Sequence, residues 1–435
     1  MTTFPRYDRY KDSGVEWLGE IPEHWKLLPG RVTLSLNKEK NTGNIEDTVL
    51  SLSYGRLVIK PPEKLTGLVP ESFESYQIIN PGDIVIRPTD LQNDWTSLRV
   101  GLAKNRGIIT SAYLGLKHDD KVSSEYLYYL LHSYDLLKVY YGMGTGLRQN
   151  LDWRDFKYLP LSIPPKPEQD RIVTFLDRKT AEIDALIAKK QRQIELLDEQ
   201  KAILINRAVT RGLNPNAKLK PSGIEWIGDI PEHWEIPKFL YLCLSIRDGT
   251  HNPPPATEGL HRLLSVRNIQ EGRFFTREDD RKMSAREFKI LQRSYTVEPG
   301  DVVIALVGGT TGKSAVVEID TAEISVQRSL GILRPNPKKV DSHFLNYAIQ
   351  NRATQKVIWE LATKYAAQPG IYLDDLGRLR IPTPPLEEQK EVVAHCNQLA
   401  ANSHKAAKKI SDEIESLKTL RSTLIAHAVT GRIKV

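Results

Sequence analysis

The stretch VVIALVGGTTGKS, residues 302–314, could carry phosphate chemistry, because a run of β-branched residues leads into a loop rich in glycine. A nucleotide-binding P-loop needs the spacing Gly-x-x-x-x-Gly-Lys-Ser/Thr, so that backbone N–H groups can wrap around the phosphates. Val307 stands where the first glycine belongs, and no acidic partner for magnesium stands out on a strand. The stretch therefore argues against an ATPase and favours a glycine-rich turn that presents Lys313 to another kind of phosphate.

Two other stretches are candidates for methyl-transfer chemistry. HNPPPA, residues 251–256, approaches the Asn-Pro-Pro-aromatic motif of amino-group DNA methyltransferases, but Pro255 takes the aromatic position and cannot stack on a flipped base. GMGTG, residues 142–146, resembles a glycine-rich cofactor loop, yet it follows an aromatic-rich stretch that predicts a helix and not the strand which that motif requires. Methylation by this chain itself therefore remains only an alternative hypothesis.

No set of residues predicts nucleophilic catalysis or a metal site. The ten histidines are scattered, and Cys243 and Cys396 are far apart and lie outside any Cys-x-x-Cys pair. A disulfide framework or a bound metal is therefore not expected, and the cysteine content favours a reducing compartment. His24 and His233 recur in the sequence PEHW, where packing is the expected role. Stacking of the neighbouring tryptophans on nucleobases is the less favoured alternative.

Length and composition indicate a multidomain globular protein. The chain has 435 residues, of which 40% are hydrophobic and 26% charged, and a formal net charge of +7. This length predicts about two to four domains, and the charge is compatible with a polyanionic partner without requiring one. The N-terminus lacks the apolar core of a signal peptide, and the longest apolar run, residues 302–307, is too short to cross a bilayer. We therefore expect a soluble cytoplasmic protein.

The chain contains the same design twice. SGVEWLGEIPEHW at residues 13–25 returns as SGIEWIGDIPEHW at residues 222–234, with ten of thirteen positions identical. Further pairs follow in the same order along the chain, and such self-similarity is typical of a duplicated structure. These pairs are PGDIVIR and PGDVVIA, LDWRDFKYLPLSIPPKPEQ and IYLDDLGRLRIPTPPLEEQ, and AVTRG and AVTGR.

A long helix is expected at the end of each copy. From residue 168 to residue 209, seam positions recur at alternating steps of three and four, as in a coiled coil, and a shift of 220 residues gives a matching seam near the C-terminus. Because polar residues weaken both seams and the chain must return, we expect the two helices to pair as an antiparallel coiled coil. The residues expected to pair are Val173, Leu176, Ile183, Ile187, Ile194, Leu197, Leu204, Val393, Ile410, Ile414, Leu417 and Leu424.

The sequence thus predicts an α+β fold with an internal pseudo-two-fold repeat, in which two globular domains alternate with two long helices. Acidic and basic residues nearly balance in the helices, so most of the positive excess falls in the globular domains, where a polyanion would bind. An ordinary buried helix in a larger core is the alternative to the coiled coil. The expected segments are globular domain 1 at residues 1–163, helix 1 at 164–212, globular domain 2 at 213–383 and helix 2 at 384–435.

Together these motifs resemble the specificity subunit of type I restriction-modification systems over essentially the whole chain. The resemblance rests on the SGVEWLGEIPEHW pair, the PGDIVI and PGDVVI strands, GTTGKSAVV, TGLRQNLDW, the helix entries PPKPEQ and PPLEEQ, and the closing AVTRG and AVTGR. It implies two target-recognition domains, each reading one half of a split and asymmetric DNA site. An antiparallel pair of conserved helices would hold these domains apart.

The resemblance also implies that this chain is not itself an enzyme and holds no cofactor. Its partners would be double-stranded DNA, two methyltransferase subunits and, where the system cleaves DNA, restriction and translocase subunits, with no membrane partner. Adenine methylation and ATP-driven cleavage would belong to those subunits, which would use S-adenosylmethionine, ATP and Mg²⁺. A coiled-coil scaffold with no role in DNA binding is a further alternative.

Polar residues beside the divergent loops are the candidates for DNA contact. Between the shared landmarks the two copies differ strongly, as in RPTDLQNDWTSLRVGL against ALVGGTTGKSAVVEID, so the two half-sites should differ as well. The flanking side chains carry donors suited to phosphates or purine edges, and a structural or solvated role stays open for each. The candidates are Arg87, Arg148, Gln149, Asn150, Lys313, Gln327, Arg328 and Gln368.

Overall fold

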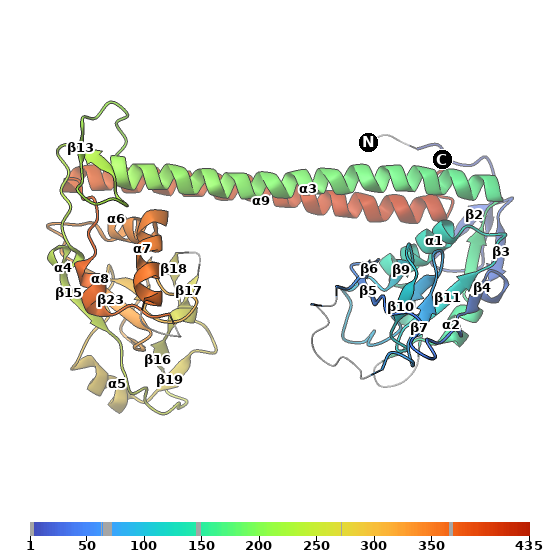
Figure 1. The fold of residues 1–435 in the computed structure, drawn as a ribbon, viewed down its shortest axis with the longest axis horizontal. Helices are drawn as coiled ribbons and strands as arrows, with labels where there is room; N and C mark the ends of the chain where they lie inside the picture. The colour runs from blue at the N-terminus through green and yellow to red at the C-terminus, as the bar shows by residue number, and fades with distance from the viewer. Residues whose placement is uncertain (1–3, 62, 64–71, 145–148, 271, 365–368) are drawn as a thin grey trace. The chain divides into compact units, whose positions relative to one another are not determined.

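The computed structural model describes residues 4–61, 63, 72–144, 149–270, 272–364 and 369–435 (Figure 1). The chain divides into two compact units, unit 1 made of Met1–Gln191 with Ser411–Val435 and unit 2 made of Arg192–Ile410. Each unit is a mixed α/β region together with parts of both long helices. The boundary between the units therefore runs through the helices and not at their ends.

Unit 1 is built on a four-stranded antiparallel sheet with the order β4-β11-β8-β9. Four separate strand pairs, β1-β2, β3-β12, β5-β6 and β7-β10, complete its β-structure among the described residues. Its strands are β1 (Tyr10–Asp12), β2 (Glu20–Pro22), β3 (Lys26–Pro29), β4 (Leu34–Leu36), β5 (Leu50–Ser53), β6 (Arg56–Ile59), β7 (Gln77–Ile79), β8 (Ile84–Ile86), β9 (Val100–Leu102), β10 (Gly107–Ile109), β11 (Leu114–His118) and β12 (Pro160–Ile163). Its shorter helices are α1 (Ser124–Leu136), α2 (Trp153–Lys157), η1 (Gly30–Val32) and η3 (Val139–Gly142).

Unit 2 has a six-stranded sheet with the order β15-β23-β20-β21-β18-β17, a three-stranded sheet β19-β16-β22 and the pair β13-β14. Its strands are β13 (Leu219–Pro221), β14 (Asp229–Pro231), β15 (Cys243–Asp248), β16 (His261–Leu264), β17 (Ile269–Gln270), β18 (Arg273–Phe274), β19 (Arg281–Met283), β20 (Val302–Ala305), β21 (Ser314–Val316), β22 (Ile324–Val326) and β23 (Leu330–Pro335). Its shorter helices are α4 (Phe239–Leu242), η4 (Val266–Asn268), α5 (Ala285–Gln292), α6 (Ser342–Gln350), α7 (Arg352–Thr363) and α8 (Leu373–Arg378).

The two sheets share the order of four antiparallel strands, β4-β11-β8-β9 in unit 1 and β15-β23-β20-β21 in unit 2. The repeated PGD sequence makes the same turn before the central strands β8 and β20. Gly82 and Gly300 have positive φ angles of 94° and 90°, which glycine adopts without the clash of a Cβ atom. The next carboxylate, of Asp83 or Asp301, accepts a hydrogen bond from the backbone N–H three residues before it, at 2.9 and 2.8 Å.

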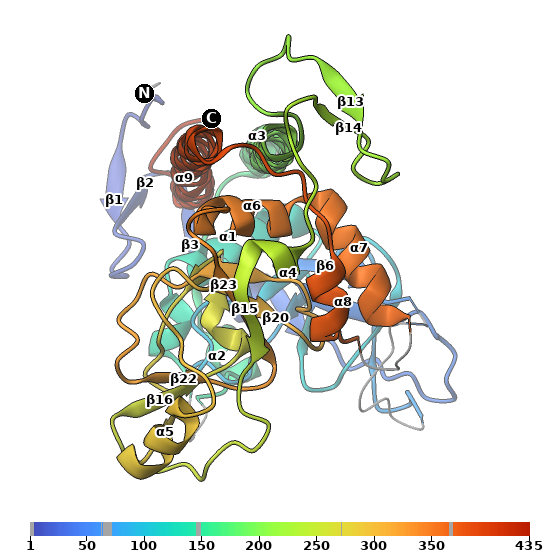
Figure 2. The ribbon, with the colours of Figure 1, turned by 90° about the vertical axis from the view of Figure 1, so that its left-hand side faces the viewer.

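One helix in each unit packs between the sheet and the long helices. In unit 1, α1 shares a core with strands β8, β9 and β11 and with apolar residues of both long helices. In unit 2, α6 does the same against β20 and β23, as Figure 2 shows from the end of that unit. The sheets are therefore tied to the helices through a continuous apolar core in each unit.

The long helices are α3 (Lys166–Arg211) and α9 (Leu386–Val429). Both begin directly after a pair of prolines, because proline ends the preceding strand and is compatible with a helix start. In unit 1 the first part of α3 packs with the last part of α9, where Ile172 and Leu176 share a core with Ile425 and Val429. In unit 2 the last part of α3 packs with the first part of α9, through Ala208, Val209, Val392 and Cys396.

The twelve residues expected to pair the helices are all buried or half-buried. Two of the polar seam positions have ionic partners on the other helix. Lys190 pairs with Glu413, and Arg421 pairs with Asp184 at 2.9 Å. Ser403 is buried, and among the described residues its hydroxyl has no hydrogen-bond partner. Charge pairing between the helices thus compensates for two of the polar seam positions, Lys190 and Arg421.

The repeated PEHW sequence and the repeated Glu of the PP-x-x-EQ helix entry contact each other in both units. His24 Nε2 lies 2.8 Å from Glu168 Oε2, and Trp25 Nε1 donates to Glu168 Oε1 at 3.2 Å. His233 and Trp234 make the same contacts to Glu388, at 2.7 and 3.1 Å. Trp25 and Trp234 have no exposed surface. Packing is therefore the role of these two tryptophans, which cannot stack on nucleobases.

The Gln of the same helix entry joins each long helix to the shorter helix beside it. Gln169 accepts a hydrogen bond from the N-cap residue of α1, Ser123 (2.9 Å), and donates to the carbonyl of Pro164 (2.9 Å). Gln389 accepts from the N-cap residue of α6, Asp341 (2.8 Å), and donates to the carbonyl of Pro384 (2.8 Å). The EQ pair is thus a structural joint, used in the same way in both units.

Among the described residues, no helix combines the length and the apolar character needed to cross a bilayer. The same residues contain no cluster of three or more His, Cys, Asp or Glu side chains that could hold a metal ion.

Candidate nucleic-acid interface

In unit 1 the candidate interface is the loop of residues 88–98, which joins β8 to β9. Ile86 lies opposite Val100 in the sheet, and the backbone N–H of Arg87 donates to the carbonyl of Arg99 at 2.8 Å. This hydrogen bond closes the hairpin, so residues 88–98 project from the end of the central strand. The sequence of this loop is among those that differ most between the two copies.

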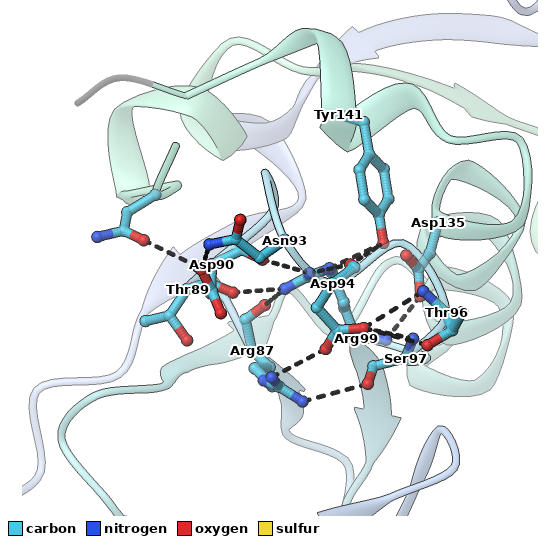
Figure 3. Close-up of polar contacts among 11 residues, drawn as sticks. Arg87, Thr89, Asp90, Asn93, Asp94, Thr96, Ser97, Arg99, Asp135 and Tyr141 are labelled. Carbon is cyan, nitrogen blue, oxygen red and sulfur yellow. Dashed lines mark hydrogen bonds and ion pairs between the residues drawn. The ribbon is translucent and has the colours of Figure 1, made fainter. Parts of the chain in front are cut away.

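The guanidinium of Arg99 is the centre of this loop (Figure 3). Arg99 has no exposed surface, although it carries a charge and lies at the start of a strand. Its Nε donates to the hydroxyl of Tyr141 at 3.2 Å. Its two terminal nitrogens donate to backbone carbonyls of the loop, namely Thr89 (2.7 Å), Asp94 (2.6 Å), Asp90 (3.3 Å) and Arg87 (3.4 Å).

The side chain of Arg87, a predicted DNA contact, is engaged within the loop. It pairs with Asp94 at 2.9 Å and retains 30% of its exposure. Asp94 also accepts a hydrogen bond from the backbone N–H of Ser97 at 2.9 Å. Hydrogen bonds from Ser97, together with the charge of Arg87, hold the pKa of Asp94 well below its usual range. Arg87 therefore has both a structural partner and a surface that a phosphate could reach.

Gln149 and Asn150 lie against the same loop. Asn150 Oδ1 accepts a hydrogen bond from the backbone N–H of Asp90 at 3.0 Å, and the side chain of Asn150 is otherwise exposed. The amide of Gln149 points inward and donates to the carbonyls of Tyr141 (2.6 Å) and Met143 (3.0 Å). The structure thus brings three sequence-predicted residues to one loop, and it gives Gln149 a structural role. Arg148 lies outside the described residues.

In unit 2 the corresponding loop is formed by residues 306–312, between β20 and β21. The backbone N–H of Ala305 donates to the carbonyl of Lys313 at 2.7 Å, which is the same closing bond as in unit 1. Lys313 is exposed. The amide of Gln355 donates to the carbonyl of Gly312 at 2.8 Å and so holds the loop from α7. The stretch with the appearance of a P-loop is therefore a hairpin turn that presents a lysine.

Gln327 and Arg328 lie beside this second loop, just before β23. Their backbone N–H groups donate to the carbonyls of Leu264 and Thr250, at 2.9 and 3.0 Å. Arg328 is exposed and Gln327 is half-buried. Because β23 runs next to β20, these residues and Lys313 gather at one end of the sheet. Gln368 lies outside the described residues.

The repeated sequences that begin with Leu151 and Ile371 contact the loop of their own unit through their first residue. The backbone N–H of Leu151 donates to Pro88 (2.9 Å) in unit 1, and that of Ile371 donates to Leu306 (2.9 Å) in unit 2. Candidates that are distant in the sequence therefore converge because β8 and β20 end beside these segments. Each unit has one candidate interface, at the end of its central strand.

Two residues of the first interface were not identified from the sequence. Trp95, in the loop, is 54% exposed, and its ring stacks on Tyr141 with the centroids 4.5 Å apart. Arg99 was missed because a charged residue in a loop sequence is usually solvated. The available signal was its position immediately before the apolar run of β9, which places it at the buried edge of a sheet.

The methyl-transfer motifs have ordinary local roles where the structure describes them. In HNPPPA, His251 pairs with Asp248 at 2.6 Å, and the carbonyl of Asn252 accepts from the hydroxyl of Thr250 at 3.1 Å. Asn252 and Pro255 are exposed. In GMGTG, residues 145 and 146 lie outside the described residues.

Comparisons with known proteins agree with this architecture. The 25% identical specificity subunit of the type I restriction enzyme MjaVIII, from Methanocaldococcus jannaschii, aligns over 95% of this chain and 94% of its own length. The specificity subunit of the type I restriction enzyme EcoKI, from Escherichia coli strain K12, is 20% identical over 95% of this chain and 90% of its own length.

Solved structures resemble the fold over almost the full length. A chain from a study of the assembly and conformational transition of the type I R-M system has a TM-score of 0.68 at 15% identity and covers 94% of this chain and 98% of its own. The HsdS subunit from Thermoanaerobacter tengcongensis has a TM-score of 0.50 at 16% identity, covering 95% and 98%. The family model of the type I restriction modification DNA specificity domain matches residues 109–196 and 267–416, more than half of the chain. This protein therefore belongs to the family of type I restriction-modification DNA specificity domains.

Proposed function

We propose that this chain is the non-catalytic DNA sequence-specificity subunit of a type I restriction-modification enzyme and that it reads a bipartite, asymmetric site. Beside the family, one observation carries the proposal: the two units share the same order of four strands, but the loops that follow the central strand differ. Both units close the same hairpin with the same backbone hydrogen bond, and the residues inside the hairpins differ in length and chemistry. Base contacts carry sequence information, so unlike loops read unlike half-sites.

The loops and their neighbours supply the proposed DNA contacts. Lysine and arginine bind phosphates, whereas amide side chains suit purine edges. Exposure at Asn150, Lys313 and Arg328 supports this role most directly. The other proposed contacts are Arg87, Arg148, Gln327 and Gln368. Gln149, also a candidate from the sequence, supports the loop through its amide, which donates to two backbone carbonyls.

We propose that residues 1–163 and 213–383 act as target-recognition domains and residues 164–212 and 384–435 as the conserved spacer. The spacer is an antiparallel coiled coil of α3 and α9 with a pseudo-two-fold repeat, supported by the helix contacts within each unit. Two methyltransferase subunits dock on this chain, and restriction subunits join through them. S-adenosylmethionine, ATP and Mg²⁺ are used by those partners, in the cytoplasm.

Methyl transfer with and without the partner tests the division of labour. The purified chain with DNA and labelled S-adenosylmethionine transfers no methyl groups alone and directs site-selective adenine methylation when its methyltransferase subunit is added. Asn252→Ala leaves the second result unchanged. Methyl transfer by the chain alone, abolished by Asn252→Ala, would instead favour the methyltransferase alternative. Absence of salt-sensitive, sequence-selective DNA binding with the partner present would favour a scaffold.

Shortening the helices tests the spacer. The pairs Lys190–Glu413 and Asp184–Arg421 indicate that residues 195–201 of α3 face about residues 403–409 of α9. Deleting both segments removes one heptad, about 10 Å of helix, which equals the rise of about three base pairs. The gap between half-sites should shorten by that amount with both half-sites unchanged. Altered half-sites at a constant gap would contradict the spacer role.

A further inference from the structure

Arg99 is a buried cation whose hydrogen bonds serve one loop. It has no exposed surface, and its guanidinium donates to four backbone carbonyls between residues 87 and 94. Burying a charge is costly unless hydrogen bonds replace the lost water. Here the replacements are the loop carbonyls, so the loop conformation and the burial of Arg99 depend on each other.

The residues around Arg99 anchor it to the frame of unit 1. Its backbone N–H donates to Asp135 Oδ2, on α1, at 2.6 Å, and its Nε donates to the hydroxyl of Tyr141 at 3.2 Å. Trp95 stacks on the ring of Tyr141, and the Nζ of Lys138 donates to the carbonyl of Trp95 at 2.6 Å. The loop is therefore anchored both to α1 and to the segment that follows α1. Arg99 contacts both anchors, through Asp135 and through Tyr141.

A lysine could not replace this link. A guanidinium offers five N–H donors in a rigid planar fork, whereas an ammonium is a compact group with three donors. The carbonyls of Thr89 and Asp94 are bound by different terminal nitrogens of Arg99, at 2.7 and 2.6 Å. Unit 2 has Lys313 at the equivalent hairpin position, where the side chain is exposed and the loop is held by Gln355 instead.

We propose that Arg99 is a positioning residue for DNA specificity, which sets the base preference of the half-site read by unit 1 by fixing the loop of residues 88–98. It does not touch DNA. It presents Trp95, Arg87 and the neighbouring Asn150 in one arrangement toward the groove. This inference rests on the proposed function, because it assumes that the loop meets DNA.

The test compares Arg99→Lys and Arg99→Met in the full chain with its methyltransferase subunit. The readout is the ratio of methylation rates on the cognate site and on sites with one base substituted, measured separately in each half-site. Loss of a well-placed base contact changes such a ratio by about tenfold or more. The ratio should fall by this factor in one half-site, more for Met than for Lys, and stay within about twofold in the other.

Amide hydrogen exchange in the free chain gives a second readout. In both Arg99 variants, exchange should become faster at residues 90–97, while the strands β8 and β11 stay protected. Leu116→Ala is the matched control, because it makes a cavity in the same sheet at the position opposite Ile84, which begins β8, whereas the loop follows the other end of β8. This control should lower the unfolding temperature and leave the discrimination ratios unchanged.

Wild-type ratios in both Arg99 variants would overturn the proposal. Loss of reading in both half-sites, or unfolding of unit 1 without a separate change in the loop, would give Arg99 only a structural role and overturn it as well. Failure of the proposed function is distinguishable, because the wild-type complex would then lack discrimination in either half-site.

Discussion

The two hairpins of this protein begin from the same hydrogen bond and end in different loops. In unit 1 the residue that accepts this bond is Arg99, which is buried and gathers residues 88–98 around its guanidinium. In unit 2 it is Lys313, which is exposed beside a shorter loop that depends on a positive-φ glycine, Gly312, and on Gln355. The same strand register thus carries loops that are stabilised in unrelated ways, so the loops can diverge while the sheet stays the same.

The joints between the sheet regions and the long helices are, by contrast, alike. His24 and Trp25 meet Glu168 as His233 and Trp234 meet Glu388. One difference remains, since the hydroxyl of Tyr7 also donates to Glu168, at 2.5 Å. The side chain of Glu168 is only 6% exposed, against 25% for Glu388. Glu168 and Glu388 therefore make the same type of contact, but we expect the contacts of Glu168 to stabilise its unit more.

Removing the two glutamates should have the largest effect on stability. Glu168→Ala leaves three donors without their acceptor and should lower the free energy of unfolding by about 3 kcal/mol, whereas Glu388→Ala leaves two and should cost about 1–2 kcal/mol. Urea denaturation of the full chain, with hydrogen exchange to assign the loss to a unit, measures both. Equal losses from the two substitutions would show that the third donor contributes nothing.

The contacts of Glu168 should also make the stability of unit 1 depend on pH in the acid range. Burial raises the pKa of Glu168, but hydrogen bonds from Tyr7, His24 and Trp25 outweigh it and leave the pKa below its ordinary value. A carboxylate with a lowered pKa stabilises the fold above its unfolded pKa, and this stability is lost as the pH falls through the folded value. In Glu168→Gln, the loss of stability below about pH 4 should be smaller than in the natural chain.

His132 should add a second acid-dependent loss of stability to unit 1, in a higher pH range than that of Glu168. It lies nine residues after the N-cap Ser123 of α1, where α6 has Gln350 after Asp341. Burial, followed by the charge of Arg421, lowers the pKa of His132 to about 4. Below about pH 6.5 the unfolded chain therefore binds a proton at His132, whereas the folded chain does not bind it until the pH falls to about 4. This difference lowers the free energy of unfolding by up to about 3 kcal/mol at pH 4.

His132→Gln should therefore flatten the decline in stability between pH 6.5 and pH 4. Burial raises the pKa of Asp135 to about 6, which favours the fold as the pH falls, so the comparison must be made between His132→Gln and the natural chain. Denaturation at a series of pH values measures it. A pH profile identical to that of the natural chain would mean that His132 is free to protonate in the folded state.

The smallest effects are expected along the helices. Ser403→Ala removes a buried hydroxyl without a partner among the described residues and should stabilise the chain by about 0.5–1 kcal/mol. Lys190→Met removes a half-exposed ion pair with Glu413 and should change stability by less than about 1 kcal/mol. Thermal unfolding measures both. A larger loss from Lys190→Met would mean that the ion pair specifies the pairing of the helices.

The sequence predicted the elements better than the contacts. Proline pairs and seam periodicity predicted long helices within residues 164–212 and 384–435, because both signals are local, and α3 and α9 run from Lys166 to Arg211 and from Leu386 to Val429. The sequence also identified Arg87 and Asn150 beside a divergent loop. It could not show that the amide of Gln149 turns inward to two carbonyls, nor that Arg99 is buried, because both depend on a loop closing around them.

In this protein one strand framework carries two unlike loops, each of which we propose reads DNA. Methylome sequencing of cells that express this chain with its methyltransferase shows whether both loops read DNA. We expect methylated adenine in a motif of two dissimilar half-sites separated by a fixed gap. A single uninterrupted motif, or a motif with two identical halves, would contradict this expectation.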